Sequence, residues 1–231
     1  MPDSAPTVLA FDTSAAHCAA AVVRGDLVLA HRVEPMTRGQ AERLFPLLDE
    51  MLAEAGMQWG DLAAIGVGTG PGNFTGIRIS VAAARGLALG LGVPAIGVTA
   101  TEAAAFDLPR PCHVVVPLRG DEVVWQEFPA TEAAGEGNLA AIAQHGSALP
   151  QTAVQAALSQ QGVFSDGPRL AMRAALPFGP APLAPAWPLP VAIARIAAER
   201  AARGPLPRPA PVYLRAADAA PPRDPPPPIL P

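Results

Sequence analysis

The sequence predicts an α/β fold in which helices cover the faces of a mixed β-sheet. Three strand-like segments open the chain, and helical and strand-like segments then alternate up to about residue 106. Such an order combines antiparallel strands with strands that need a helical crossover. Half of the 231 residues are apolar, so the chain is long enough for one large domain or two small ones with a sizeable core.

The opening strands are short apolar runs that end at polar residues or turns. Arg24-Gly25-Asp26 separates the second run from the third and is a good hairpin turn. The predicted strands are Thr7–Asp12, His17–Val23 and Leu27–Val33.

Two helices follow in the first half of the chain. Leucine and methionine at helical spacing predict a helix over Gln40–Ala55 that stops at Gly56, and Pro46 either kinks this helix or marks a start one residue earlier. Asn73 is a plausible N-cap of a second helix that extends to about Gly90. The other elements predicted in this half are the strands Ala63–Gly68 and Val93–Val98 and the short helix Thr101–Phe106.

The second helix has two patterns on its surface. Apolar residues alternate spacings of three and four, which is typical of a narrow heptad-like seam: Phe74, Ile77, Val81, Ala84, Ala88 and Leu91. A second row, Ala82, Gly86 and Gly90, is small at every fourth position and would permit close approach of another helix.

The second half of the chain is less regular. Predicted strands flank the turn Arg119-Gly120-Asp121, a proline near the start and arginines near the end predict a final helix, and prolines predict an extended or disordered tail. The predicted elements are strands His113–Pro117, Glu122–Phe128 and Val163–Ser165, weak helices Leu139–Ala143 and Ala153–Ser159, the helix Pro190–Arg203 and the tail 219–231.

A glycine loop joins the fourth strand to the second helix. Residues 66–76 contain five glycines and one proline, so backbone N–H groups at a helix N-terminus could receive an anion. Neither nucleotide fingerprint fits: the Walker pattern needs a lysine and the chain has none, and the third glycine of the dinucleotide pattern is Asn73. The alternative is that the glycines allow a strand and a helix to pack closely.

Composition limits the classes of function. The net charge of −4 makes the isolated chain a poor binder of nucleic acid. The four histidines are scattered, and the two cysteines lie among apolar neighbours, which favours buried, reduced thiols. The longest uncharged stretch, Gly86–Thr101, is too short and broken to span a membrane, so we expect a cytoplasmic protein.

Two motifs carry a resemblance to a known family. Val8-Leu9-Ala10-Phe11-Asp12-Thr13-Ser14 and Gly70-Pro71-Gly72-Asn73-Phe74-Thr75-Gly76-Ile77-Arg78 closely resemble the bacterial TsaB (YeaZ-like) family, which is glycoprotease-like or peptidase M22-like. The match is strong over residues 7–106, weak over 107–210 and local at Pro211-Val212-Tyr213-Leu214-Arg215.

This resemblance implies an actin-like (ASKHA) two-lobed fold with a reduced second lobe. It divides the chain into a first lobe with partner-binding helices, a smaller second lobe and a tail, at residues 1–106, 107–218 and 219–231. It implies a scaffold role in making N6-threonylcarbamoyladenosine at position 37 of tRNA. The implied partners are a TsaD-like catalytic subunit and a TsaE-like ATPase, with tRNA contacted only through the complex.

The residues agree with a noncatalytic role, with no catalytic residue, metal or cofactor expected. Metal-binding relatives carry H-x-x-x-H on a first-lobe helix, whereas Thr37–Arg43 contains no histidine. Actin-like ATPases have a glycine in their first phosphate hairpin at the position where this chain has Ser14. The corresponding loop of the second lobe, Ser165-Asp166-Gly167-Pro168, lacks a glycine pair. A vestigial nucleotide or anion site is therefore expected at Asp12, Thr13, Ser14, Gly70, Gly72 and Asn73.

The two first-lobe helices are expected to pack against their counterparts in the TsaD-like subunit, or against a second copy when the chain is alone. The predicted interface consists of Leu44, Leu48, Met51, Ala55, Phe74, Ile77, Arg78, Val81, Ala84 and Ala88. Two other functions remain open. An actin-like ATPase or small-molecule kinase would use Asp12 near a metal, and an M22-type peptidase would need a nucleophile–base pair that the sequence does not reveal.

Overall fold

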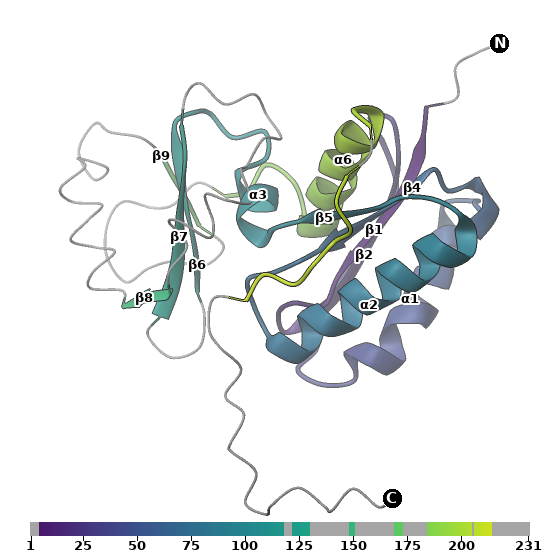
Figure 1. Cartoon of the computed structure of the whole chain (residues 1–231), viewed down its shortest axis with the longest axis horizontal. Coiled ribbons are helices and arrows are strands. Elements are labelled where there is room, and N and C mark those ends of the chain that lie inside the picture. Colours follow the sequence, from purple (N-terminus) through teal and green to yellow (C-terminus); the bar gives the residue numbers. More distant parts are fainter. Residues whose placement is uncertain are drawn as a thin grey trace, which may run out of the picture.

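A computed structural model of the chain describes residues 5–117, 122–129, 148–150, 169–172, 184–204 and 206–213. Within these residues, two β-sheets lie next to each other and helices cover the larger one (Figure 1). The larger sheet has the strand order β3-β2-β1-β4-β5 and the smaller has the order β8-β7-β6-β9. The predicted mixed α/β architecture is confirmed.

The larger sheet combines an antiparallel half with a parallel half. Strands β1, β2 and β3 pair antiparallel, whereas β4 and β5 join β1 in parallel. The bounds are β1 Thr7–Asp12, β2 His17–Arg24, β3 Leu27–Pro35, β4 Ala64–Gly68 and β5 Ala95–Val98. Every residue of β1 is buried, because helices cover both faces of the sheet.

Two helix layers enclose this sheet. Helices α1 (Gln40–Glu54) and α2 (Phe74–Leu91) cover one face, and α6 (Leu189–Ala202) covers the other (Figure 1). Because strand side chains alternate between faces, Leu9 of β1 belongs to the core beneath α1 and α2, whereas Val8 belongs to the core beneath α6.

Helix α6 corrects the predicted boundary between the lobes. It was expected in the second lobe because it follows residue 106, but its Val191, Ile193 and Ile196 pack in one cluster with residues of the larger sheet. A division at residue 106 therefore does not separate the two packing units, since the chain returns to the first sheet after the second.

The helix ends follow the local sequence. The Asn73 side chain accepts a hydrogen bond from the Gly76 N–H at the start of α2, and Gly92 ends this helix at φ 71°. A short 3-10 turn, Trp59–Asp61, precedes β4. Helix α1 begins at Gln40 and continues through Pro46.

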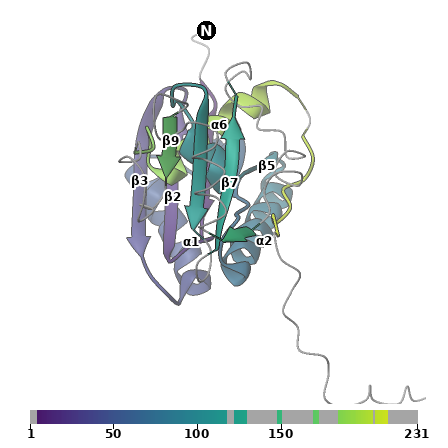
Figure 2. The same ribbon diagram turned by 90° about the vertical axis from the view of Figure 1, so that its left-hand side faces the viewer.

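The smaller sheet contains two strands that the sequence predicted and two that it did not. Strands β6 (Cys112–Pro117) and β7 (Glu122–Phe128) pair antiparallel as predicted. Short strands β8 (Ala148–Pro150) and β9 (Arg169–Met172) flank them, and β7 and β9 stand in front of the larger sheet in Figure 2.

The short helix α3 (Ala100–Ala105) joins the two sheets by packing its alanines against buried residues of β6 and β7. Several predictions for this half lie outside the described residues: the turn 119–121, the helices 139–143 and 153–159, the strand 163–165, the loop 165–168 and the tail 219–231.

Candidate functional site

Asp12 closes the turn between β1 and β2. The residue is 1% exposed, and its Oδ1 accepts hydrogen bonds from the Ser14 backbone N–H at 3.1 Å and from the Ser14 hydroxyl at 2.9 Å. The same oxygen lies 2.6 Å from Nε2 of His17. A buried carboxylate requires such partners, so Asp12 organises the turn in this structure.

The glycine loop packs directly on this turn. The Thr13 hydroxyl donates to the Gly76 carbonyl oxygen at 2.6 Å, and the Asn73 N–H donates to the Ser14 carbonyl oxygen at 2.6 Å. A Cβ atom on Gly72 would collide with the Ser14 oxygen, and one on Gly76 would collide with the Thr13 oxygen. These glycines are therefore explained by the close approach of two backbones.

The structure brings the predicted anion-site residues together as a packed junction. A Cβ on Gly68 would collide with the Asp12 carboxylate, and Gly70 adopts φ 89°, which favours glycine. The predicted site residues all belong to this turn or this loop: Asp12, Thr13, Ser14, Gly70, Gly72 and Asn73. Binding of an anion or nucleotide by them stays a prediction.

The two thiols are poorly suited to nucleophilic chemistry. Burial raises the pKa of Cys18 to about 11, and burial also raises the pKa of Cys112. The histidine next to Cys112, His113, accepts a hydrogen bond on Nδ1 from the Trp125 indole at 3.0 Å. Among the residues described, no three His, Cys, Asp or Glu side chains are grouped to hold a metal ion.

The inner faces of α1 and α2 form the core of the lobe, which corrects the choice of interface residues. Six of the residues predicted to contact a partner are at most 2% exposed: Leu44, Leu48, Met51, Ile77, Val81 and Ala84. They pack in one cluster with Leu9 and Phe11 of the sheet. Apolar spacings of three and four are what a helix needs to cover its own sheet, so the seam did not indicate a second surface.

The other four predicted interface residues remain at least partly accessible. Phe74 is 38% exposed, Arg78 is exposed, and Ala55 and Ala88 are half-buried. A role for these four in an interface stays a prediction.

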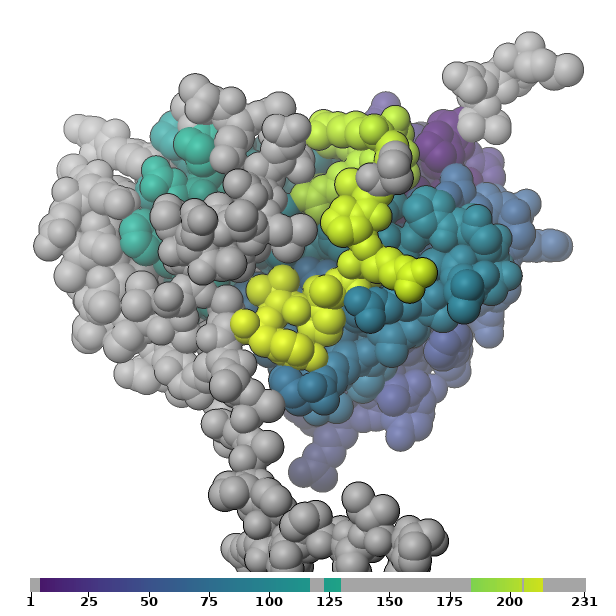
Figure 3. Space-filling view, viewed as in Figure 1, coloured from purple at the N-terminus to yellow at the C-terminus, as the bar shows by residue number. Residues whose placement is uncertain are grey.

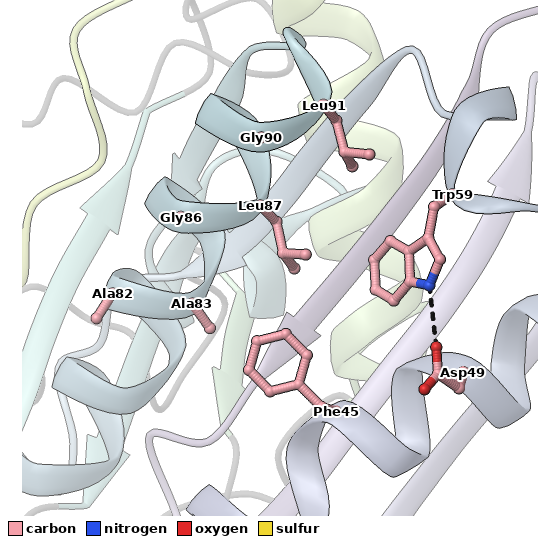
Figure 4. A pocket seen from close by; sticks show the side chains of 9 residues that line it. All are labelled: Phe45, Asp49, Trp59, Ala82, Ala83, Gly86, Leu87, Gly90 and Leu91. Carbon is pink, nitrogen blue, oxygen red and sulfur yellow. Dashed lines mark hydrogen bonds between the residues drawn. The ribbon is translucent and has the colours of Figure 1, made fainter.

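The outer faces of the same helices border an apolar groove, here called the α1–α2 groove. It has a volume of about 640 Å³ and is lined by Phe45, Asp49, Trp59, Ala82, Ala83, Gly86, Leu87, Gly90 and Leu91. The Phe45 and Trp59 rings rise from one side and the leucines from the other (Figure 4). The Trp59 indole donates to Asp49 Oδ1 at 2.9 Å, which fixes the ring at the edge of the groove.

The small residues of α2 leave this groove open. Ala82, Gly86 and Gly90 are all exposed, and a Cβ on either glycine would meet nothing within 4 Å. Helix α2 has a mean hydropathy of 1.3 over its 18 residues, yet only 33% of it is buried. By length and composition it is the one described helix that could cross a membrane, but it packs one face on the sheet. The part of its outer face that lines the groove, at Ala82, Gly86 and Gly90, is not covered by the described part of the chain.

Ion pairs link α1 to the edge strand β3. Arg43 pairs with Glu34 and Glu50, and Arg32 pairs with Glu50 and Glu54. Hydrogen bonds from Arg43 lower the pKa of Glu50 to about 2. This edge of the helix pair therefore carries fixed charges that already have partners.

A C-terminal segment, residues 206–213, lies over α2 and is here called the strap. Its Val212 N–H donates to the Thr69 carbonyl oxygen at 2.9 Å, and Arg85 of α2 donates to the Pro209 carbonyl oxygen at 2.8 Å. Figure 3 shows the strap in yellow against α2. The motif at residues 211–215 was visible in the sequence, but no sequence signal indicated where its described residues, 211–213, pack.

Comparison with protein families gives a match over the central part of the chain. The family described as TsaD: tRNA N6-adenosine threonylcarbamoyltransferase matches residues 28–164. This stretch includes α1, the glycine loop and α2.

Individual relatives carry related names. TsaB of Haemophilus influenzae, described as a tRNA threonylcarbamoyladenosine biosynthesis protein, is 37% identical over 52% of this chain and 53% of the relative. TsaB of Escherichia coli, with the same description, is 34% identical over 54% of this chain and 56% of the relative. The matched region thus spans about half the length of these curated relatives.

A solved structure supports the fold. A crystal structure described as an uncharacterized protein with similarity to peptidase YeaZ from Pseudomonas aeruginosa has a TM-score of 0.59. It is 24% identical and covers 91% of this chain and 100% of its own. The chain is similar to this structure in fold.

Proposed function

The chain belongs to the family described as TsaD: tRNA N6-adenosine threonylcarbamoyltransferase, and we propose that it acts as a noncatalytic scaffold in tRNA threonylcarbamoyladenosine biosynthesis. In this proposal it docks on a TsaD-like catalytic subunit and activates it. A TsaE-like ATPase completes the complex, tRNA is contacted through the complex, and the protein works in the cytoplasm.

The observation that carries this proposal is the open α1–α2 groove. Large exposed apolar surfaces on a folded protein are typical of interaction sites. Phe45 is 46% exposed at the groove, and the glycines of α2 leave room for a second helix to approach closely. A pair of partner helices laid into this groove would form a four-helix bundle, which buries apolar surface on both proteins.

The rest of the site favours a scaffold over an enzyme. The Asp12 carboxylate that an ATPase would use near a metal is buried and is engaged by Ser14 of the turn and by His17 at the start of β2. The thiols that a peptidase would use are buried and have raised pKa values. An ATPase would therefore need a carboxylate that is already hydrogen-bonded, and a peptidase would need thiols whose raised pKa values keep them protonated.

The proposal is tested by placing a large charged side chain in the groove. Gly86→Arg fills open space on an exposed helical position, so the variant should fold as well as the parent, with a helix propensity gain of about 0.5–1 kcal/mol. It should lose co-purification with a co-expressed TsaD-like subunit and should lower tRNA modification by the reconstituted complex.

The matched control places arginine at an apolar surface position away from the groove. Leu27→Arg, at a position that is 65% exposed on the edge strand β3, should leave complex formation unchanged. Full binding by Gly86→Arg would show that the partner does not use this groove. Saturable binding and turnover of ATP with Mg²⁺ by the isolated chain would instead favour the ATPase alternative.

A further inference from the structure

Arg78 stands at the start of α2 in a cluster of aromatic rings. Its Nε donates to the Tyr213 hydroxyl at 2.8 Å, and its guanidinium carbon lies 3.8 Å from the centroid of the Phe74 ring. The two rings are 4.9 Å apart and tilted by 37°. Stacking and the hydrogen bond together fix the plane of the guanidinium.

The cluster exists only in the folded chain. Arg78 and Phe74 lie on consecutive turns of α2, whereas Tyr213 comes from the strap, 135 residues after Arg78. The strap is held on α2 and its loop by the hydrogen bonds of Val212 and Pro209. The guanidinium is therefore oriented before any ligand arrives, which lowers the entropy lost on binding.

Arg78 has hydrogen-bond donors that no described residue accepts from. The terminal nitrogens of Arg32 and Arg43 bind carboxylates, whereas the described residues provide no hydrogen bond or ion pair for the two terminal nitrogens of Arg78. A planar guanidinium with both terminal nitrogens available is suited to a bidentate contact with a carboxylate or phosphate.

The surroundings favour a carboxylate on a protein. Arg78 begins an exposed row on α2 at four-residue spacing, followed by Ala82, Gly86 and Gly90, which line the α1–α2 groove. At 1.5 Å per residue the row is about 18 Å long, the length of a short helix. A protein helix lying in the groove can therefore reach the guanidinium.

Charge argues against a nucleic acid at the same place. Helix α1, across the groove, carries four acidic residues and one arginine, whereas α2 carries two arginines and no acidic residue. Nucleic acids need an extended basic footprint, and α1 does not supply one on its side of the groove. A single carboxylate at the start of α2 needs only one arginine.

We infer that Arg78 binds an aspartate or glutamate side chain of the protein that docks in the α1–α2 groove, and that this contact sets the register of the docked helix. The inference rests on the proposed function, because it assigns a specificity contact to the same surface. Tyr213 acts here as a positioning residue, since it orients Arg78 through Nε.

The test measures affinity for the TsaD-like subunit and its salt dependence with the full chain. Arg78→Ala should raise Kd about 10- to 100-fold and flatten the dependence of Kd on salt, because one ion pair is lost. Arg78→Lys should recover part of the affinity and the salt dependence. Tyr213→Phe should raise Kd by a smaller factor of about 3 to 10, because the guanidinium keeps its charge but loses its orientation.

The matched control removes an exposed guanidinium on the opposite face of the sheet. Arg203→Ala, at the end of α6, should bind the subunit as the parent does. Thermal unfolding of each isolated variant reports whether α2 and the strap remain folded.

The outcomes separate this inference from the proposed function. Parental affinity of Arg78→Ala, together with lost binding by Gly86→Arg, would overturn the inference and leave the scaffold proposal standing. Weakened binding with an unchanged salt dependence would also overturn it, because the role would then be structural. Stabilisation of the isolated parent, but not of Arg78→Ala, by inorganic phosphate or an RNA oligonucleotide would reassign the site to phosphate.

Discussion

Helices α6 and α2 are both rich in apolar residues and cover opposite faces of the same sheet, but within the described residues only α6 is enclosed over much of its length. In α6, buried residues occur on all sides: Pro190, Val191, Ala192, Ile193, Ala194, Ile196 and Ala197. In α2, the buried residues form one stripe: Gly76, Ile77, Ser80, Val81 and Ala84.

The apolar residues of the two helices therefore have different explanations, although the composition of the helices is similar. The apolar residues of α6 are explained by packing between the sheet and the short helix α3. The outer face of α2 has no such explanation within the described chain, although Leu89 is 85% exposed and the groove beside it is apolar. An apolar helix face left uncovered is evidence for a partner only after the covered face has been identified.

The largest expected effect is a difference in stability between arginine variants at two adjacent residues of α2. Val81 is 2% exposed in the core, whereas Ala82 lies on the groove. Val81→Arg should therefore lower the free energy of unfolding by about 4 kcal/mol or more, because it buries an unpaired charge. Ala82→Arg should change it by about 0.5 kcal/mol or less, yet lose partner binding.

This pair is measured by urea unfolding and by pull-down of the TsaD-like subunit. It also means that loss of binding by Val81→Arg, or by Met51→Glu, would report unfolding rather than an interface. A folded Val81→Arg protein would contradict the assignment of the inner face.

A smaller effect is expected from truncations on the two helices. Ile193→Ala in α6 removes a fully buried side chain and should cost about 2–5 kcal/mol of stability. Leu89→Ala in α2 removes one that is 85% exposed and should cost about 0.5 kcal/mol or less. Calorimetric unfolding compares the two, and similar losses would mean that the exposed face of α2 is covered after all.

The smallest expected effect is electrostatic and tests the burial of His113 in the smaller sheet. Burial lowers the pKa of His113 below 6.5, although Glu127 opposes this shift. The folded state therefore prefers the neutral imidazole, and the unfolded chain takes up the proton first as pH falls. This part of the stability is complete above about pH 6.5 and decreases below it.

Urea midpoints at about pH 7.5 and about pH 5.5 measure this contribution. The decrease between the two should be smaller in His113→Gln, which keeps an acceptor near Trp125, than in the parent. His31→Gln, at an exposed position, should behave as the parent does. An unchanged decrease in His113→Gln would place the acid sensitivity elsewhere.

The sequence predicted the local elements of the larger sheet to within a few residues, because their signals are local. The turn at Gly25, the cap at Asn73 and the stop at Gly56 act on neighbouring residues. The strands β8 and β9 were missed, since strands of three and four residues carry almost no periodicity. The sequence also identified the glycine loop, and it left two interpretations open: an anion site, or close packing of a strand and a helix.

The sequence by itself determined which residues are apolar, where the chain turns and to which family its motifs are similar. Only the tertiary structure decided which side of α2 faces the sheet, that α6 returns to the first sheet, and that Tyr213 meets Arg78. Helical periodicity defines a stripe but not the surface that the stripe meets. That surface is set by contacts between residues far apart in the chain, and it exists only when the elements are packed together.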